Sequence, residues 1–536
     1  MNPFPPKYQS RTSKAAPIYN ASGLRANASE LPLAVYNLGM ALRSLPRSKS
    51  LGVMITASHN DWRDNGVKVA VDGHIPNALD EKKIVSLMLD VQDPPPPNTH
   101  KAPLTVGVDN RYSSLYLCRI LCLGWGGSTR FIGLCSTPQL HLFSSQSYPN
   151  HKTFNLSISD LRSHWTNNLT LAYESLLHTP KRQTLHVDCS NGVASIVIEP
   201  LVRSLNYLTL VLHNTGGGTG GGKEADCNTI LNEKCGSEYV QKSKKPPKLY
   251  DSSDTYKFRE DSNNDIWCSV DGDVDRIVFY KVISTASPLI DDASIKLFDG
   301  DRLTCLVVKY LKRVTVNLSL NIGAVQTGYA NGASTRYLED VLKVRVLCTK
   351  TGVKHLHEAA SKFDVGVYFE ANGHGSVVFS PYVLKLLTFD YKDERLKAEV
   401  KILKNIVKLC NEYVGCAVAD MLLCLVAVDE IGWDGVEEFY ADLVSSTTKF
   451  FVADKNLVEC NGDETKVLQP KGMQEELDEA MREVGGGGRC FVRKSNTEDC
   501  VRIYAEGEDD KVVRLLEDKV RVILGKFLGE GFKAKL

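Results

Sequence analysis

The stretch GVMITASHNDWRDNG, residues 52–66, carries the pattern on which the fold prediction depends. Its first five residues are largely apolar and partly β-branched, and the run is too short for a helix, so it predicts a buried β-strand that ends near Ala57. The residues that follow are polar, and Asn65-Gly66 is a dipeptide typical of turns. Ser58 and His59 are therefore expected on an exposed loop at the carboxyl end of a strand, where α/β proteins place their reactive groups.

Short apolar runs of the same kind recur along the chain and alternate with helical patterns. They are LTVGVD (104–109), TLHVDC (184–189), IWCSVD (266–271), NIGAVQT (321–327) and VGVYFE (365–370). This alternation predicts repeated α/β units with mainly parallel sheets. The last part of the chain differs, because residues 490–507 resemble two strands around a turn and an amphipathic helical pattern follows at 512–528. This pattern of two strands followed by a helix predicts a smaller α+β domain.

Composition restricts the class of protein. A chain of 536 residues is too long for one core and predicts three or four domains. Lysine plus arginine and aspartate plus glutamate number 64 each, so bulk charge gives no indication of a nucleic-acid or membrane partner. There is no apolar run of membrane-spanning or signal-peptide length, which favours a soluble cytoplasmic protein. The 15 cysteines lack any C-x-x-C pair and are expected as reduced, mostly buried thiols.

The sharpest polar cluster is DGDVDR, residues 271–276, between two strand patterns. Asp271, Asp273 and Asp275 stand at alternate positions of one loop and can converge on a hard divalent cation, for which oxygen ligands suit Mg²⁺. An EF-hand would need Gly in place of Arg276 and Glu in place of Val282, so that type of site is excluded. A solvated acidic turn is the weaker interpretation, because three neighbouring carboxylates beside buried strands need a counter-charge.

Two other polar loops suggest ligands less specifically. Glu370, Asn372 and His374 on a glycine-shaped loop offer groups suited to sugar hydroxyls. In residues 491–498, a guanidinium, two hydroxyls and a turn of backbone N–H groups suit a phosphate dianion, although a plain polar turn explains the composition equally well.

The tract GGGTGGGK, which ends at Lys223, is close to a phosphate-binding P-loop. Glu224 stands where such a loop needs Ser or Thr, and no clear helical pattern follows. A flexible linker is therefore the better interpretation. CTKTGVKHLHE (348–358) carries two histidines but lacks the H-E-x-x-H pattern of zinc proteases.

Taken in order, ITASHN, DGDVDR, EANGHG and RKSNTED resemble the α-D-phosphohexomutase superfamily. Its phosphoacetylglucosamine mutase family is the closer resemblance, through the runs DNGVKV, STPQLH, VDCSNG, LNEKCG, VQTGYANGASTRYL, CTKTGVKHLH and YFEANGHG. The matching runs extend from about Tyr19 to Glu506.

The resemblance implies four domains around a central cleft. They are a phosphoserine-loop α/β domain (1–165), a metal-binding α/β domain (166–285), a sugar-binding α/β domain (286–440) and a C-terminal phosphate-binding α+β domain of the TATA-box-binding-protein-like type (441–536).

The resemblance also implies an activity. The chain would be an isomerase that interconverts N-acetylglucosamine 6-phosphate and 1-phosphate through a phosphoserine and a hexose 1,6-bisphosphate, feeding UDP-N-acetylglucosamine synthesis. It would need one Mg²⁺ and the bisphosphate, would bind only small sugar phosphates, and would be a monomer or weak homodimer. Two alternatives stay open: a phosphoglucomutase or phosphomannomutase of the same superfamily, and a non-catalytic sugar-phosphate-binding relative.

Particular residues acquire roles from the resemblance. Ser58 would carry the phosphate and join Asp271, Asp273 and Asp275 as a Mg²⁺ ligand. The groups expected to support charge and catalysis beside the serine are His59, Lys68, Arg25, Arg111 and Arg276. The sugar would be held by Glu370, Asn372, Gly373 and His374. The phosphate that is not transferred would be held by Arg493, Ser495, Asn496, Thr497 and Arg502.

The chain departs from the family pattern outside its serine, aspartate and sugar loops. Residues 20–25 read NASGLR where the family has G-T-A-G-F-R. Asp61 replaces a usual Pro, and Val108 and Asn110 alter the usual G-R-D-T-R before Arg111. In the phosphate loop, Lys494 and Asn496 replace Pro and Gly. These changes are expected to affect efficiency more than chemistry.

Overall fold

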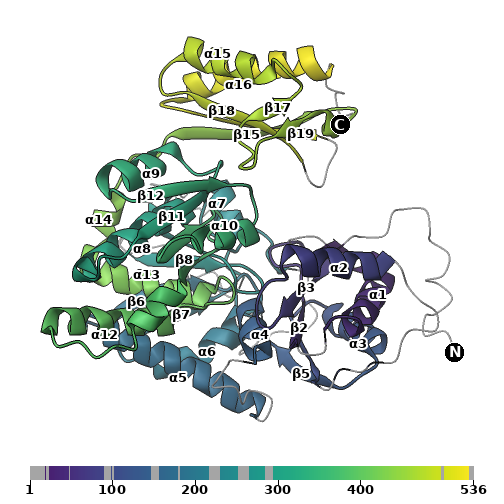
Figure 1. Ribbon diagram of the computed structural model, residues 1–536, viewed down its shortest axis with the longest axis vertical. Coiled ribbons are helices and arrows are strands. Elements are labelled where there is room, and N and C mark those ends of the chain that lie inside the picture. The colour runs from purple at the N-terminus through teal and green to yellow at the C-terminus, as the bar shows by residue number, and fades with distance from the viewer. Residues whose placement is uncertain are drawn as a thin grey trace. The chain divides into compact units, whose positions relative to one another are not determined.

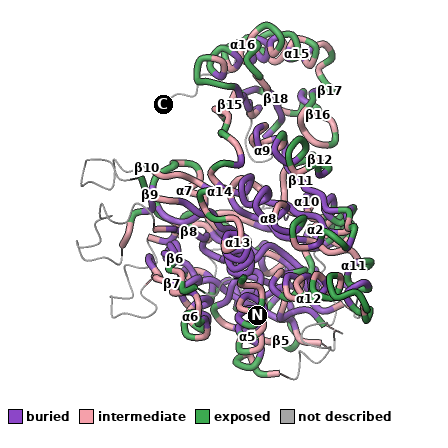
Figure 2. The backbone as a smooth tube through the Cα atoms, turned by 90° about the vertical axis from the view of Figure 1, so that its left-hand side faces the viewer, coloured by how far each residue is buried: buried purple, intermediate pink, exposed green. Residues whose placement is uncertain are grey.

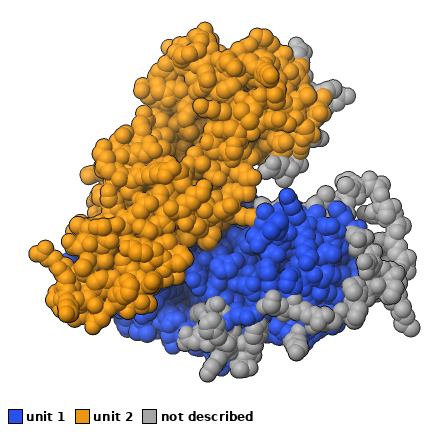
Figure 3. All heavy atoms as spheres, viewed as in Figure 1, with its two compact units in different colours: residues 1–300, 372–376, 401–429 blue, residues 301–371, 377–400, 430–536 orange. Residues whose placement is uncertain are grey.

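The computed structural model describes most of the chain, in several ranges. They are residues 19, 23–46, 49–89, 98, 100, 102–146, 156–178, 181–216, 230–250, 265–283, 294–495 and 500–529. Some predicted features lie outside them, namely the Pro94–Pro97 spacer, the GGGTGGGKE tract of residues 216–224 beyond its first glycine, and Asn496 and Thr497. The chain forms two compact units (Figure 3). Unit 1 contains residues 1–300, 372–376 and 401–429, and unit 2 contains residues 301–371, 377–400 and 430–536.

The first sheet of unit 1 carries the serine loop. Its strands are β1 (Leu24–Asn27), β2 (Leu51–Ile55), β3 (Asp64–Val71), β4 (Leu104–Val108) and β5 (Thr129–Leu134), in the order β1-β3-β2-β4-β5. The helices that accompany it are α1 (Pro32–Arg43), α2 (Ala78–Leu89), α3 (Ser114–Trp125) and α4 (Thr137–Ser144). Helix α1 packs on α2 and α3, α3 packs on β4, and α4 packs on β2 and β4. The apolar run before Ser58 is therefore a buried strand, as predicted.

The turn predicted at Asn65-Gly66 is wrong, because both residues lie inside β3. Gly66 pairs with Arg25 of β1, and a Cβ atom on it would lie 2.2 Å from the Leu24 carbonyl oxygen. The glycine is required by close approach of two strands rather than by a turn. Asn65 donates its side-chain amide to the hydroxyls of Ser113 and Ser114, which ties β3 to the start of α3.

The second sheet of unit 1 carries the aspartate loop. Its strands are β6 (Gln183–Asp188), β7 (Leu208–His213), β8 (Ile266–Val270), β9 (Ile277–Ile283) and β10 (Ser294–Phe298), in the order β10-β9-β8-β6-β7. The helices near it in sequence are α5 (Ile158–Leu176), α6 (Ala194–Ser204) and α7 (Ser237–Ser243). Helix α13 (Ala417–Ile431) is buried along most of its length, as its purple colour in Figure 2 shows. Residues from late in the chain thus complete the interior of unit 1.

Unit 2 begins with a third sheet. Its strands are β11 (Ile322–Thr327), β12 (Arg345–Thr349), β13 (Val365–Phe369) and β14 (Gly375–Phe379), in the order β12-β11-β13-β14. The helices of this region are α8 (Gly300–Val314), α9 (Gly332–Arg336), α10 (Val353–Ala360), α11 (Pro381–Leu386), α12 (Glu394–Leu409) and α14 (Trp433–Glu437). Two of these elements are divided, because residues 375–376 of β14 and residues 401–409 of α12 belong to unit 1. Short 3-10 or π segments also occur at Ala28–Glu30, Val316–Leu318, Tyr337–Val341 and Lys455–Leu457.

Parallel pairs form the centre of these three sheets, as predicted: β2 with β4, β6 with β8, and β11 with β13. Antiparallel strands, which the alternation did not predict, are added to the first two sheets. The reason is connection length. Only residues 56–63 join β2 to β3, and only residues 271–276 join β8 to β9. Such short links cannot make the crossover that a parallel neighbour needs.

The C-terminal part of unit 2 is the predicted α+β domain. Its antiparallel sheet has the order β15-β19-β18, from β15 (Val444–Phe451), β18 (Arg489–Lys494) and β19 (Cys500–Gly507). A ribbon of β16 (Glu459–Cys460) and β17 (Val467–Gln469) accompanies it. Helices α15 (Met473–Val484) and α16 (Asp510–Leu528) cover one face of the sheet (Figure 1). Val492 and Ile503 belong to the core with these helices, so Arg493 and Arg502, one position along, belong to the helix-free face.

Two further observations concern the described residues alone. Every cysteine among them is a free thiol. Within the same residues, no helix combines the length and the apolarity that crossing a bilayer requires.

Candidate active site

The serine loop connects β2 to β3. The Ser58 backbone has φ +56°, a left-handed conformation that is uncommon for a residue other than glycine. Its N–H donates to the Thr56 hydroxyl at 2.9 Å, and its own hydroxyl donates to Asp271 Oδ2 at 2.6 Å. Ser58 is fully buried, so the expectation that this serine is exposed is wrong, although Asp61 and Arg63 of the same loop are exposed. The loop follows a strand end as predicted, but groups from elsewhere in the chain pack over it.

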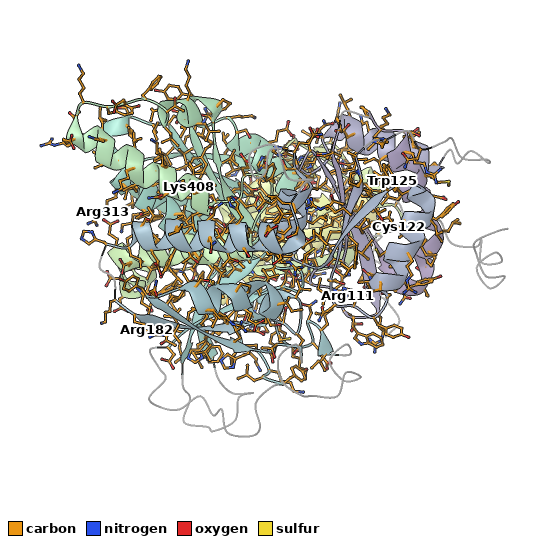
Figure 4. All side chains as sticks on the ribbon, turned by 90° about the horizontal axis from the view of Figure 1, so that it is seen from below. Arg111, Cys122, Trp125, Arg182, Arg313 and Lys408 are labelled. Atoms are coloured by element: carbon orange, nitrogen blue, oxygen red, sulfur yellow. The ribbon has the colours of Figure 1, made fainter. Side chains whose placement is uncertain are left out.

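Arg111, which is labelled in Figure 4, holds the serine loop through hydrogen bonds to the carbonyl oxygens of the loop. Its terminal nitrogens donate to the carbonyl oxygens of Ser58, Asn60, Asp61 and Asp64 at 2.5 to 3.0 Å. Its Nε donates to Asp109 Oδ2 at 2.9 Å. The guanidinium is therefore used to fix the path of the loop backbone. Arg111 supports the serine through the loop structure rather than as a charge beside its hydroxyl.

The side-chain amide of Asn232 reinforces the same loop. It donates to the carbonyl oxygens of Ser58 and Asn60, at 2.9 and 3.1 Å. Asn232 is thus a second group, after Arg111, that fixes the path of the backbone on which Ser58 lies.

Asp271, Asp273 and Asp275 lie on the loop between β8 and β9 and are all buried. One carboxylate oxygen from each lies within 4.8 Å of the others. Lys68, on β3, places its Nζ at 2.6 Å from both Asp273 and Asp275. The structure thus brings together the predicted serine, the three predicted aspartates and the predicted lysine. Lys68 supplies part of the positive charge that three neighbouring buried carboxylates need.

The donor set fits Mg²⁺. Among the described residues, the buried Oδ1 atoms of Asp273 and Asp275 have no hydrogen-bond partner. Unpaired buried carboxylate oxygens are costly, and a bound cation would satisfy them. All the candidate ligands are oxygens, which hard cations of this type prefer.

Burial and charge determine the protonation of this cluster. Burial and the neighbouring Asp275 and Asp273 raise the pKa of Asp271 well above its usual range. Burial would also raise the pKa of Asp275, but His374, followed by Lys68 and Arg276, holds that pKa well below its usual range. Burial alone would lower the pKa of Lys68, yet Asp273 and Asp275 raise it, so the side chain stays an ammonium ion.

Other predicted groups surround the serine. Arg276 forms an ion pair with Glu238 at 2.8 Å, and its Nε lies 3.8 Å from Asp271 and Asp275. Arg25 Nη1 lies 3.5 Å from the Asn60 side-chain oxygen.

His59 is a predicted catalytic residue whose side chain lines a cavity. Burial, followed by Arg276 and Arg25, lowers the pKa of His59 well below 6.5, so its ring is neutral at neutral pH. A cavity of about 350 Å³ is lined by His59, Asp271, Glu238 and Lys242, among others. A ligand in this cavity would lie beside both the neutral imidazole and a predicted metal ligand.

The predicted sugar loop is divided between the two units. Residues 372–376 belong to unit 1, where the Ile277 N–H donates to the Gly373 carbonyl oxygen at 3.1 Å. Gly373 has φ +84°, and a Cβ atom there would lie 1.8 Å from the Ile277 carbonyl oxygen. This close approach places His374 Nδ1 at 3.8 Å from Asp275, and Asn372 Oδ1 accepts from the His374 N–H at 3.0 Å. Glu370 belongs to unit 2 and accepts from the Gly352 N–H at 3.2 Å.

The predicted phosphate clamp lies in unit 2. Arg493, at 9% exposure, donates from Nε to the Tyr329 hydroxyl at 2.9 Å. Arg502 pairs with it across β18 and β19. Ser495 is buried, and its N–H donates to the Cys500 carbonyl oxygen at 2.9 Å. Asn496 and Thr497 lie outside the described residues, so the structure brings together three of the five predicted clamp residues.

Sequence reasoning missed several residues that contact this machinery. Thr137 donates its hydroxyl to Asp273 at 2.6 Å. The others are Asn232, Glu238 and Tyr329. Thr137, Asn232 and Tyr329 fall within the runs STPQLH, LNEKCG and VQTGYANG, so the resemblance marked the segments without assigning the residues. Glu238 stands just after such a run and carried no signal.

Comparison with known proteins agrees with this arrangement. Residues 299–433 match the family described as phosphoacetylglucosamine mutase AMG1, domain III, and residues 454–522 match the phosphoglucomutase/phosphomannomutase C-terminal domain. The phosphoacetylglucosamine mutase of Homo sapiens is 34% identical, with 95% of this chain and 94% of the human chain covered.

Solved structures give the same result. The crystal structure of Aspergillus fumigatus N-acetylphosphoglucosamine mutase in complex with GlcNAc-6P and magnesium has a TM-score of 0.78 and 31% identity, covering 94% of this chain and 96% of that one. A variant of the A. fumigatus mutase in complex with glucose 1,6-bisphosphate has a TM-score of 0.78 and 29% identity, covering 96% and 95%. The chain described here therefore belongs to the phosphoacetylglucosamine mutase family.

Proposed function

We propose that this chain is an isomerase that interconverts N-acetylglucosamine 6-phosphate and N-acetylglucosamine 1-phosphate through a phosphoserine at Ser58. Its product would feed UDP-N-acetylglucosamine synthesis. The observation that carries the proposal is the 2.6 Å hydrogen bond from the Ser58 hydroxyl to Asp271, inside the buried three-aspartate cluster. The relatives with bound GlcNAc-6P and magnesium, and with glucose 1,6-bisphosphate, support the substrate and the intermediate.

Asp271, Asp273 and Asp275 would hold one Mg²⁺, with an oxygen of the Ser58 phosphate as a further ligand. Bound there, the ion would neutralise charge on the phosphoryl group during transfer. Lys68 and Arg276 add positive charge on the protein side of the same cluster, since both lie within 4 Å of its carboxylates. Phosphoryl transfer depends mainly on such positioning and charge neutralisation.

The first transfer moves the phosphoryl group from Ser58 to the sugar 1-hydroxyl. The bond from phosphorus to Ser58 Oγ breaks and a bond to the sugar oxygen forms. The sugar hydroxyl releases its proton and Ser58 Oγ takes up one proton, which leaves a 1,6-bisphosphate and a serine hydroxyl. His59 lines the cavity beside Asp271, and its neutral ring can accept a hydrogen bond from the sugar hydroxyl, although its lowered pKa makes it a weak base. After the bisphosphate turns around, the bond from phosphorus to the sugar 6-oxygen breaks and a bond to Ser58 Oγ forms. The serine hydroxyl loses its proton and the sugar 6-oxygen gains one, so N-acetylglucosamine 1-phosphate remains.

A separate group of residues would recognise the part of the ligand that does not react. We assign the distal phosphate to Arg493, Ser495, Asn496, Thr497 and Arg502, and the sugar to Glu370, Asn372, Gly373 and His374. Arg493 is the main anchor of this set, because a planar guanidinium binds phosphate oxygens through two parallel N–H groups. Arg25 and Arg111 support the serine loop, from β1 and from the connection between β4 and α3.

Three further properties remain proposals on sequence grounds. They are the division into domains at residues 1–165, 166–285, 286–440 and 441–536, a cytoplasmic location, and a monomeric or weakly dimeric state. Analytical ultracentrifugation across a range of concentrations tests the last of these.

A substrate panel tests the function. The full chain is assayed with Mg²⁺, a small amount of glucose 1,6-bisphosphate, and the 6-phosphates of N-acetylglucosamine, glucose and mannose. We expect kcat/KM to be highest for the N-acetylglucosamine compound. A higher value for glucose or mannose 6-phosphate would assign the chain to the related hexose mutases. Binding without turnover of any of the three would indicate a non-catalytic relative, and Ser58→Ala prepared in parallel defines the background rate.

A further inference from the structure

Tyr329 contacts the predicted clamp arginine from the loop that follows β11. Its hydroxyl accepts from Arg493 Nε at 2.9 Å, and the Arg493 Cζ atom lies 5.3 Å from the centre of the tyrosine ring. Both residues belong to unit 2. The tyrosine comes from the third sheet's loop and the arginine from the C-terminal sheet, so this hydrogen bond joins the two parts of that unit.

The backbone on each side of Tyr329 is fixed independently of Arg493. Arg489 donates to the Gly328 carbonyl oxygen at 3.0 Å and to the Ala330 carbonyl oxygen at 2.7 Å. Arg489 is in turn paired with the buried Glu506 at 3.3 Å. The tyrosine therefore stands between two peptide groups that one guanidinium holds.

The Tyr329 ring is fixed as well. It packs edge-on against Phe491, at 5.1 Å between ring centres and 70°, and against Tyr504, at 5.5 Å and 88°. Phe491 and Tyr504 are directly paired between β18 and β19 and lie on the helix-free face that also carries Arg493. The hydroxyl is thus held in place by contacts on backbone and ring, and the arginine adapts to it.

A guanidinium can present two pairs of parallel N–H groups to a phosphate: one pair includes Nε, and the other consists of the two terminal nitrogens. The Tyr329 hydroxyl uses the Nε–H. The Lys494 carbonyl oxygen, at 3.4 Å, and Glu464 Oε2, at 3.6 Å, both approach Nη1.

We infer that Tyr329 is a positioning residue for the phosphate clamp: by accepting the Nε–H, it fixes the plane of the Arg493 guanidinium, so that N–H groups of its terminal nitrogens not used by Lys494 and Glu464 are presented to the phosphate. This inference rests on the proposed function of Arg493. It gives the Tyr329 hydroxyl a role in ligand binding, in addition to the packing of the tyrosine ring. A tyrosine that only fills space would be replaced by phenylalanine without effect on ligand binding.

The test is Tyr329→Phe in the full chain, since this change removes the hydroxyl and keeps the ring contacts. The affinity for N-acetylglucosamine 6-phosphate, measured by isothermal titration, should fall about tenfold, the lower range for losing a hydrogen bond to a charged group. The KM should rise by a similar factor while kcat changes less than about twofold, because the distal phosphate is held equally before and during transfer. Tyr382→Phe, with a 58% exposed side chain on α11, is the matched control and should behave as wild type.

A double-mutant cycle tests whether the effect passes through Arg493. Lysine has no Nε–H, so Tyr329→Phe should weaken binding less than about twofold further in an Arg493→Lys background. An equal loss in both backgrounds would overturn the inference, as would unchanged affinity in Tyr329→Phe alone. If Tyr329→Phe loses affinity but the wild type shows no turnover, the phosphate clamp is supported and the proposed mutase activity is refuted. Unchanged affinity in Arg493→Ala would remove the clamp and this inference together.

Discussion

The aspartate loop of residues 271–276 and the clamp around Arg493 use charge in different ways. The aspartate loop buries three carboxylates, one of them hydrogen-bonded to Ser58 and two paired with Lys68. The clamp places one arginine at the end of an antiparallel strand, where a tyrosine hydroxyl orients it. The first arrangement retains the family pattern, whereas the second has Lys494 and Asn496 where the family has Pro and Gly. Transfer chemistry in a buried site requires fixed geometry, and recognition of a phosphate allows more than one solution.

Removing the phosphate carrier should have the largest effect. Ser58→Ala is expected to lower kcat by about 10⁴-fold or more, as for loss of a nucleophile. It should also lower the free energy of unfolding by about 1–2 kcal/mol, because buried Asp271 loses its donor. A coupled assay and urea unfolding measure the two effects, and intact-mass analysis should find one phosphate, mapped to Ser58, on part of the wild-type protein.

Ser445→Ala, at an exposed position of β15, is the matched control for this change. Full activity in Ser58→Ala would refute the phosphoserine and leave both regions as binding sites only.

Asp273→Asn should have the next largest effect. It removes one negative charge at nearly constant shape, together with the carboxylate that Lys68 and Thr137 contact at 2.6 Å. We expect the Mg²⁺ concentration for half-maximal activity to rise and kcat/KM to fall, each by about 100-fold, the upper range for loss of a group that orders a metal site. Chelation of wild-type protein with EDTA should abolish activity, and added Mg²⁺ should restore it.

The control is Asp518→Asn, at an exposed position of α16. An unchanged Mg²⁺ dependence in Asp273→Asn would show that the three aspartates serve only as partners of Lys68 and Arg276.

Arg493→Ala should weaken recognition rather than chemistry. Loss of a charge-assisted contact to phosphate is expected to reduce the binding free energy for N-acetylglucosamine 6-phosphate by about 2 kcal/mol. The KM should rise while kcat changes less. Titration calorimetry on the wild type, Arg493→Ala and the surface control Arg514→Ala decides it. Equal affinity in the wild type and both variants would mean that this loop does not bind the phosphate. The comparison drawn above between the aspartate loop and the clamp would then be wrong.

The smallest effect is expected from Asn496→Gly, a change that restores the family residue. Asn496 lies outside the described residues, so this prediction depends on the sequence alone. Asparagine tolerates the left-handed conformation well, and KM should therefore change by no more than about threefold. A larger fall in KM would show that the asparagine side chain crowds the phosphate, and that the clamp is less tolerant than the comparison suggests.

Local patterns predicted the strands and the order of the functional loops. The apolar runs at 104–109, 184–189 and 266–271 are strands β4, β6 and β8, because a short apolar segment between polar loops has few alternatives. The same local reasoning misjudged Gly66, since a glycine needed for close approach and a glycine needed for a turn look alike in a sequence. The distinction depends on the Leu24 carbonyl oxygen, which belongs to another strand.

The surroundings of the site could not be predicted for a related reason. Asp271, which accepts the hydrogen bond from the Ser58 hydroxyl, is 213 positions away from Ser58 in the chain. Asn232, which donates to the Ser58 carbonyl oxygen, is 174 positions away. Tyr329 and Arg493 are 164 positions apart. No spacing rule links such pairs, and only the folded chain shows that they meet. The resemblance supplied the reactive residues and Arg111, whereas Asn232 and Tyr329 stood in matching runs without an assigned role.

The composition of unit 1 has a consequence for synthesis on the ribosome. His374, beside Asp275, and the buried helix α13 come from residues 372–376 and 401–429, long after the serine and aspartate loops. A nascent chain that has emerged only to residue 300 holds Ser58 and all three aspartates but lacks part of the interior that encloses them. The reactive cluster can therefore reach its final form only after residues up to 429 have emerged from the ribosome.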